Sequence, residues 1–296
     1  RNLALVLLKQ GRVQEAVAEL GEGLRQDPDS FWLHFALGEA RLAGGEVDAA
    51  VESFGRAVQL APDSASARFN LANALIRLGR WEEARRHLEV LVEASPGDSN
   101  ARYLLAMYRY QLGERAAAET ELRRLLEESP GHAAAREALA RMLLAARRFA
   151  EAAEEFSAIE PPTGESSAGA AVALSQAGRQ REALILLEEG LRRLPGDGAV
   201  LLALARLLAT CPDPALRDGP RALELAEELD RTQPTLLHAE AVAMALAATG
   251  DFSRAAEWQR SLVDQAREAG QALLAARLAA DLRFYEQGRP IVRPLG

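Results

Sequence analysis

Residues 65–98 read ASARFNLANALIRLGRWEEARRHLEVLVEASPGD, and this stretch decides the fold. Apolar residues recur at helical spacing up to Gly79, and a second helical stretch starts at Trp81 and stops before Pro96. Glycine accepts the left-handed conformation that closes a helix, and proline cannot continue one. The stretch therefore predicts two helices joined by a tight turn.

The same pattern recurs along the chain with a period of 34 residues. Prolines keep this step at Pro28, Pro62, Pro96 and Pro130. Glycines keep it at Gly11, Gly45, Gly79 and Gly113, and alanines at Ala16, Ala50, Ala84 and Ala118. Three residue types in one phase indicate an array of equivalent helical hairpins.

The pattern resembles the tetratricopeptide repeat, a helical hairpin of 34 residues. In residues 31–64, Leu37 and Gly38 stand where the family has its Leu-Gly pair. The packing positions of the second helix hold Ala50, Phe54 and Ala57. The resemblance implies an all-α fold, a right-handed α-solenoid of about eight hairpins with a C-terminal capping helix and roughly one superhelical turn.

Extending the phase predicts the boundaries of the repeats. Residues 1–269 divide into eight repeats: 1–30, 31–64, 65–98, 99–132, 133–163, 164–197, 198–235 and 236–269. The seventh is longer than the others and contains CPDPALRDGP (Cys211 to Pro220), so a loop is expected at 211–219, with Pro220 near the start of the next helix. Residues 270–296 are expected to form a capping helix, roughly Gln271 to Gln287, and a tail.

Composition excludes several classes of function. Lys and Arg number 35 against 43 Asp and Glu, and this net charge of -8 disfavours nucleic-acid binding. No apolar run is long enough to insert into a membrane. Arginine far outnumbers lysine and Ala and Gly are abundant, which favours a bacterial source. The compartment, cytoplasmic or periplasmic and envelope-associated, and self-association are left open.

Residues for catalysis are not arranged in known motifs. The four histidines, His34, His87, His132 and His238, form no metal-binding pattern, and no glycine-rich phosphate loop is present. The single cysteine, Cys211, excludes an intrachain disulfide, and no motif supplies it with an activating base. We therefore expect a protein that is not an enzyme and holds no metal or cofactor.

A binding face follows from the resemblance. It implies that positions 2, 5, 9 and 12 of each repeat line a concave groove, and aromatic residues gather there in repeats two to four. The candidate partner-binding residues are Trp32, Phe35, Glu39, Phe69, Asn73, Ile76, Asn100, Tyr103, Met107 and Tyr110. Aromatic residues are enriched at binding hot spots, and amides can hydrogen-bond a peptide backbone. Alternatively, Phe35, Phe69 and Tyr103 pack between hairpins.

Two hypotheses about function remain. The first is a non-catalytic scaffold that binds a peptide or partner protein in this groove. The second is a recruiting or regulatory arm of a larger bacterial enzyme or membrane complex, for example a glycosyltransferase, whose catalytic part precedes Arg1. The residues before Arg1 would distinguish the two.

Overall fold

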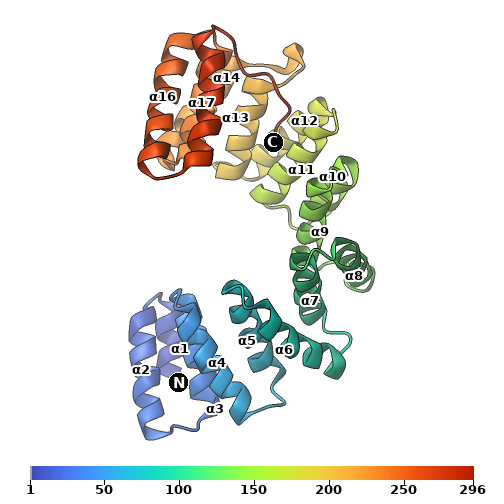
Figure 1. The fold of residues 1–296 in the computed structure, drawn as a ribbon, viewed down its shortest axis with the longest axis vertical. Helices are drawn as coiled ribbons and strands as arrows, with labels where there is room; N and C mark the ends of the chain where they lie inside the picture. Colours follow the sequence, from blue (N-terminus) through green and yellow to red (C-terminus); the bar gives the residue numbers. More distant parts are fainter. Residues whose placement is uncertain (1) are drawn as a thin grey trace. The chain divides into compact units, whose positions relative to one another are not determined.

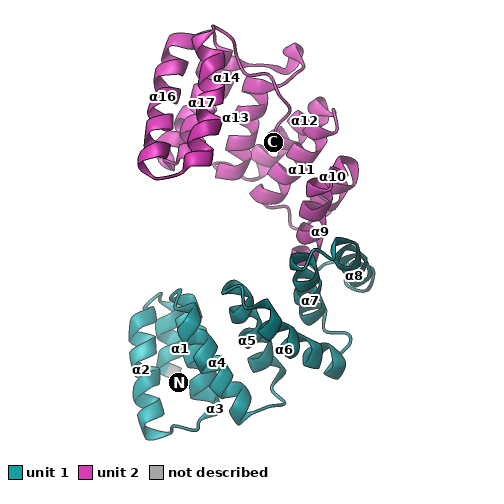
Figure 2. Ribbon diagram, viewed as in Figure 1, with its two compact units in different colours: residues 1–132 teal, residues 133–296 magenta. Residues whose placement is uncertain are grey.

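The computed structural model describes residues 2–296, and within this range the chain forms seventeen α-helices and no strand (Figure 1). It divides into two compact units, residues 1–132 and residues 133–296 (Figure 2). Unit 1 contains α1 (Asn2–Lys9), α2 (Val13–Gln26), α3 (Phe31–Ala43), α4 (Val47–Leu60), α5 (Ala65–Arg77), α6 (Trp81–Ala94), α7 (Ser99–Gln111) and α8 (Arg115–Glu128). Unit 2 contains α9 (Ala133–Ala145), α10 (Phe149–Ser157), α11 (Gly164–Gln176), α12 (Gln180–Arg193), α13 (Gly198–Thr210), α14 (Gly219–Thr232), α15 (Leu236–Ala248), α16 (Phe252–Glu268) and α17 (Ala272–Glu286).

Consecutive helices pair into hairpins, and each hairpin packs on its neighbour within a unit. The turns inside the hairpins are closed by residues in the left-handed region, such as Gly45 (φ 79°) and Gly79 (φ 72°). In the fifth repeat this position is occupied by Arg147 (φ 61°). The glycines recur because the backbone of each turn needs a positive φ at this position, and in the fifth repeat a non-glycine residue adopts it.

Close approach between helices explains the small residues of the repeat. In the second repeat, Gly38 of α3 faces the fully buried ring of Phe54 in α4, and a Cβ on Gly38 would lie 2.6 Å from two ring carbons. Ala50 and Ala57 are fully buried on the same helix as Phe54. These contacts confirm the packing roles expected for the repeat.

The irregular turn of the seventh repeat is confirmed as a loop. Helix α13 stops at Thr210, a short 3₁₀ turn covers Pro214–Leu216, and α14 begins at Gly219. Pro220 lies in the first turn of α14, where a missing N–H costs nothing. Asp213 and Asp218 cap the 3₁₀ turn and α14 with their side chains.

The chain closes with α17, which packs against α16 and buries Ala275 and Leu278, as expected for a capping helix. Residues 289–296 follow without helical structure and run from α17 across α13 toward α11 (Figure 1). None of the helices in residues 2–296 has the length and apolarity needed to cross a bilayer.

Candidate functional site

The ten candidate residues all lie on α3, α5 and α7, the first helices of three successive hairpins in unit 1. Because the period equals the repeat length, residues 34 apart occupy equivalent positions on these helices. All ten side chains are at least partly accessible to solvent. The structure therefore leaves the predicted strip available at the surface of unit 1.

Aromatic rings are stacked at the start of α3. Phe31 contacts Trp32 edge-on at 4.9 Å between ring centroids and stacks on Phe35 at 5.8 Å. Phe35 in turn meets the buried ring of Phe54 at 5.9 Å. Trp32 stays 55% exposed, so a large apolar side chain reaches solvent beside rings that pack on the buried Phe54.

A hollow of about 390 Å³ lies between α3, α5 and the start of α7. Four candidate residues line it: Phe35, Glu39, Phe69 and Asn100. The remaining lining comes from Ala65, Ser66, Asn70 and Asp98. Aromatic, amide and carboxylate groups from three repeats thus line one depression.

The start of α7 is fixed by local hydrogen bonds. Asp98 caps the helix by accepting from the backbone N–H groups of Asn100 and Ala101, at 3.0 and 3.1 Å. The Asn100 Oδ1 lies 3.2 Å from Nε2 of His132, whose ring lies 5.5 Å from that of Tyr103. These contacts hold the amide of Asn100 at the edge of the hollow.

The alternative role of the aromatic residues also finds support. Phe35, Phe69, Ile76 and Tyr103 are half-buried and pack against the core of unit 1 that contains Phe54. Each therefore supports the stacking of hairpins while keeping part of its surface accessible.

The other candidates are less clearly grouped. Asn73, Met107 and Tyr110 are half-buried and lie outside the lining of the hollow, as do Trp32, Ile76 and Tyr103. Asp98 is a lining residue that the groove positions did not include, because it precedes α7 as its cap. An Asp just before a helix is a recognisable sequence signal for that position.

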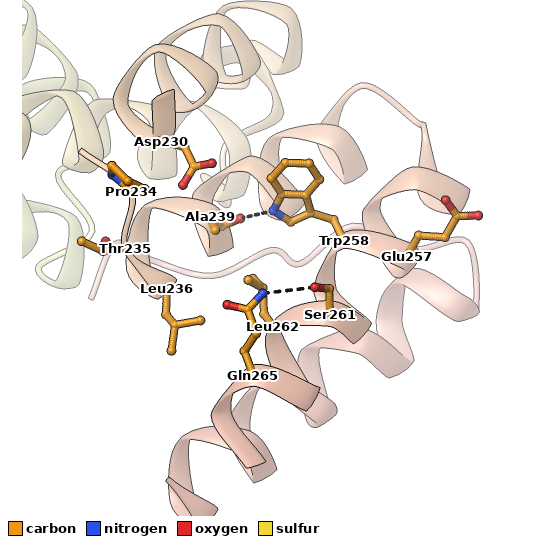
Figure 3. Close-up of a pocket in the computed structure, with 10 residues that line it drawn as sticks. All are labelled: Asp230, Pro234, Thr235, Leu236, Ala239, Glu257, Trp258, Ser261, Leu262 and Gln265. Carbon is orange, nitrogen blue, oxygen red and sulfur yellow. Dashed lines mark hydrogen bonds between the residues drawn. The ribbon is translucent and has the colours of Figure 1, made fainter. Parts of the chain in front are cut away.

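Unit 2 contains another hollow, of about 660 Å³, which no motif in the sequence predicts. Trp258 of α16 lies on it, and its indole N–H donates to the backbone oxygen of Ala239 at 2.9 Å (Figure 3). Gln265 and Ser261 are hydrogen-bonded beside it at 3.1 Å (Figure 3). Asp230 and Glu257 complete a lining of mixed polarity.

Two of the residues considered for chemistry, Cys211 and His34, have local structural surroundings. Cys211 is fully buried, and burial raises the pKa of its thiol, which favours the unreactive protonated form. His34 has Nε2 at 2.8 Å from the backbone oxygen of Pro28. Within residues 2–296, no three His, Cys, Asp or Glu side chains are grouped to hold a metal ion.

Comparison with known proteins identifies the repeat. Family models described as tetratricopeptide repeat match residues 41–108 in one case and residues 1–65 and 103–167 in another. Together the matches span residues 1–167, more than half of the chain. No curated protein is similar enough to be matched.

Solved structures share the fold at low sequence identity. A tetratricopeptide repeat protein from Parabacteroides merdae is 17% identical with a TM-score of 0.61, over 83% of this chain and 96% of that one. PilW, described as a widely conserved type IV pilus biogenesis factor, is 22% identical with a TM-score of 0.59, over 69% and 96%. Pseudomonas aeruginosa pilF is 20% identical with a TM-score of 0.54, over 67% and 92%. The matched repeats and the stacked hairpins together show that the chain belongs to the tetratricopeptide-repeat family.

Proposed function

We propose that the chain is a non-catalytic scaffold that binds an extended peptide segment of a partner protein across α3, α5 and α7 of unit 1. The observation that supports this most strongly is the hollow lined by Phe35, Phe69 and Asn100, close in sequence to the exposed Trp32. Helical solenoids commonly bind partners on such extended surfaces. The ring faces would contact apolar side chains, and the amide would bond the peptide backbone.

The charge of the hollow favours one class of peptide. Its lining in the described chain carries the carboxylates of Glu39 and Asp98 and no Lys or Arg. Opposite charge across an interface raises the rate of encounter and suppresses wrong partners. We therefore expect the bound segment to carry Lys or Arg beside its apolar residues.

The test selects peptides from a random 12-residue display library on the full chain and measures their affinities for variants. Trp32→Ala should weaken selected peptides by about 2 kcal/mol, roughly thirtyfold, because truncation of a hot-spot aromatic has that cost. Its melting temperature should barely change, since the side chain is mostly exposed. Val90→Ala is the matched control, because Val90 is an exposed apolar residue on α6 of the same unit.

Two outcomes would count against the proposal. One is a set of selected peptides that bind Trp32→Ala and the parent chain equally well. The other is loss of binding accompanied by an equal loss of folding stability, which would make Trp32 a packing residue.

A further inference from the structure

The segment Arg289–Gly296 lies against α13 and α11 of unit 2 as an extended peptide segment. Arg289 and Arg293 each precede a proline, Pro290 and Pro294, and a residue before proline is restricted to extended conformations. The side chains alternate accordingly: Ile291 and Leu295 are 6% and 3% exposed, whereas Val292 is 50% exposed. This alternation is the pattern of a bound peptide with one face in a groove.

Hydrogen bonds to backbone atoms anchor Arg293 and Leu295, two residues apart in the segment. The N–H of Arg293 donates to the backbone oxygen of Thr210 at 2.9 Å. The Thr210 hydroxyl lies 2.9 Å from the backbone oxygen of Arg206 in its own helix and 3.3 Å from that of Arg293. Because Thr210 is the last residue of α13, no N–H of that helix donates to its carbonyl oxygen. The segment therefore satisfies a group that the helix itself leaves open.

Two residues later, the backbone N–H and oxygen of Leu295 are both bonded to side chains of α11. The N–H of Leu295 donates to the Ser175 hydroxyl at 3.0 Å, and the Gln176 side-chain amide donates to the backbone oxygen of Leu295 at 3.0 Å. Arg206 donates to the backbone oxygen of Gly296 at 2.8 Å. Ser175 and Arg206 occupy positions 12 and 9 of their repeats, which the family resemblance assigns to the groove.

A buried acidic pair receives the arginine of the segment. Arg293 forms two hydrogen bonds to the carboxylate of Asp281, at 3.3 and 3.2 Å, and lies 3.9 Å from Glu240. Both carboxylates are almost fully buried, and Arg277 of α17 bonds to Glu240. A guanidinium that binds both oxygens of a buried carboxylate through its two terminal nitrogens makes a geometrically selective contact.

We propose that unit 2 contains a second peptide site, separate from that of unit 1, and that residues 289–296 occupy it as a tethered ligand. The site recognises an extended segment in which an arginine is flanked, two residues to either side, by aliphatic side chains. A partner segment of this chemistry binds only by displacing the tail. The structure thus assigns the tail the role of an intramolecular competitor.

Tethering sets the size of the expected effect. A short linker holds a bound segment at an effective concentration on the order of millimolar. A free peptide with an intrinsic dissociation constant of about 0.1 mM would therefore bind the intact chain roughly tenfold more weakly than a chain whose tail is released.

The test measures binding of a fluorescein-labelled peptide with the sequence of residues 289–296 by fluorescence anisotropy. Leu295→Asp in the full chain should release the tail and strengthen peptide binding by about tenfold or more, since it puts a charge into the buried pocket. Val292→Asp, at the exposed position of the same segment, should leave the affinity at the parental value. A labelled peptide with Glu in place of the arginine equivalent to Arg293 should not bind.

A second preparation covers the case in which Leu295→Asp does not fold. A protease site inserted after Gly288 allows the tail to be cut once the protein has folded. A cut chain that retains the tail, or exchanges it for the labelled peptide, supports the proposal. A cut chain that does neither, or a folded Leu295→Asp chain that binds no better than Val292→Asp, overturns it. Neither measurement depends on the groove of unit 1.

Discussion

Substitution of Gly38 by alanine gives a direct test of the packing that holds the repeats together. Alanine is favoured over glycine in a helix interior by about 1 kcal/mol. The added methyl group, however, would lie 2.6 Å from two carbons of Phe54, whose ring is fully enclosed and cannot move into solvent. Overpacking of this kind costs up to about 3 kcal/mol. We therefore expect a net loss of about 2 kcal/mol of unfolding free energy.

Gly55 provides the matched control in the same hairpin. It lies within α4, and a methyl group there would meet no atom within 4 Å other than those of its chain neighbours and its own helical backbone. Gly55→Ala should therefore stabilise unit 1 by about 1 kcal/mol, the opposite sign to Gly38→Ala. Urea unfolding followed by tryptophan fluorescence in a Trp258→Phe background reports on unit 1, which contains the other two tryptophans. Equal stabilisation by both substitutions would refute the close helix approach.

Three further substitutions test single interactions. Burial lowers the pKa of His87 below its ordinary value of 6.5, so on acidification the unfolded chain takes up a proton before the folded chain does. The free energy of unfolding should therefore fall as the pH drops below 6.5. His87→Gln should flatten this dependence of stability on pH, measured by urea unfolding. Glu121→Ala should cost about 1–3 kcal/mol in urea unfolding, because it leaves the buried Nε of Arg102 without its acceptor at 2.8 Å while Glu128 still bonds the Nη1 of that guanidinium. Arg147→Gly should raise the melting temperature. A left-handed backbone costs a non-glycine residue about 1–2 kcal/mol in the folded state, and the extra conformational entropy that glycine gives the unfolded state offsets only part of the relief.

The repeat itself was predictable from sequence because its signals are local. The turn at Gly79, the break at Pro96 and the packing positions of Ala50, Phe54 and Ala57 each follow from residue types within a single hairpin. The same reasoning placed α17 within one residue of its observed start at Ala272. The period and phase of the repeat thus predicted the helices, whereas the hand of the superhelix and its number of turns stay predictions.

The binding face was predictable only in part. Position within the repeat identified Phe35, Phe69 and Asn100 as accessible, but periodicity does not distinguish a side chain that binds from one that packs, and both aromatic residues do some packing. The placement of residues 289–296 could not be foreseen. Its contacts join Leu295 to Ser175, 120 positions away, and the 34-residue pattern carries no information about such a pairing.

The most direct test of the scaffold function is to locate a bound peptide on unit 1. The photoreactive residue p-benzoylphenylalanine is introduced at position 39, where Glu39 lines the hollow, or at position 90 on α6. A peptide selected on the parent chain is added, irradiated and analysed by mass spectrometry. The account predicts a covalent adduct from position 39 and none from position 90. Adducts at position 90 with none at position 39 would place binding elsewhere and contradict it.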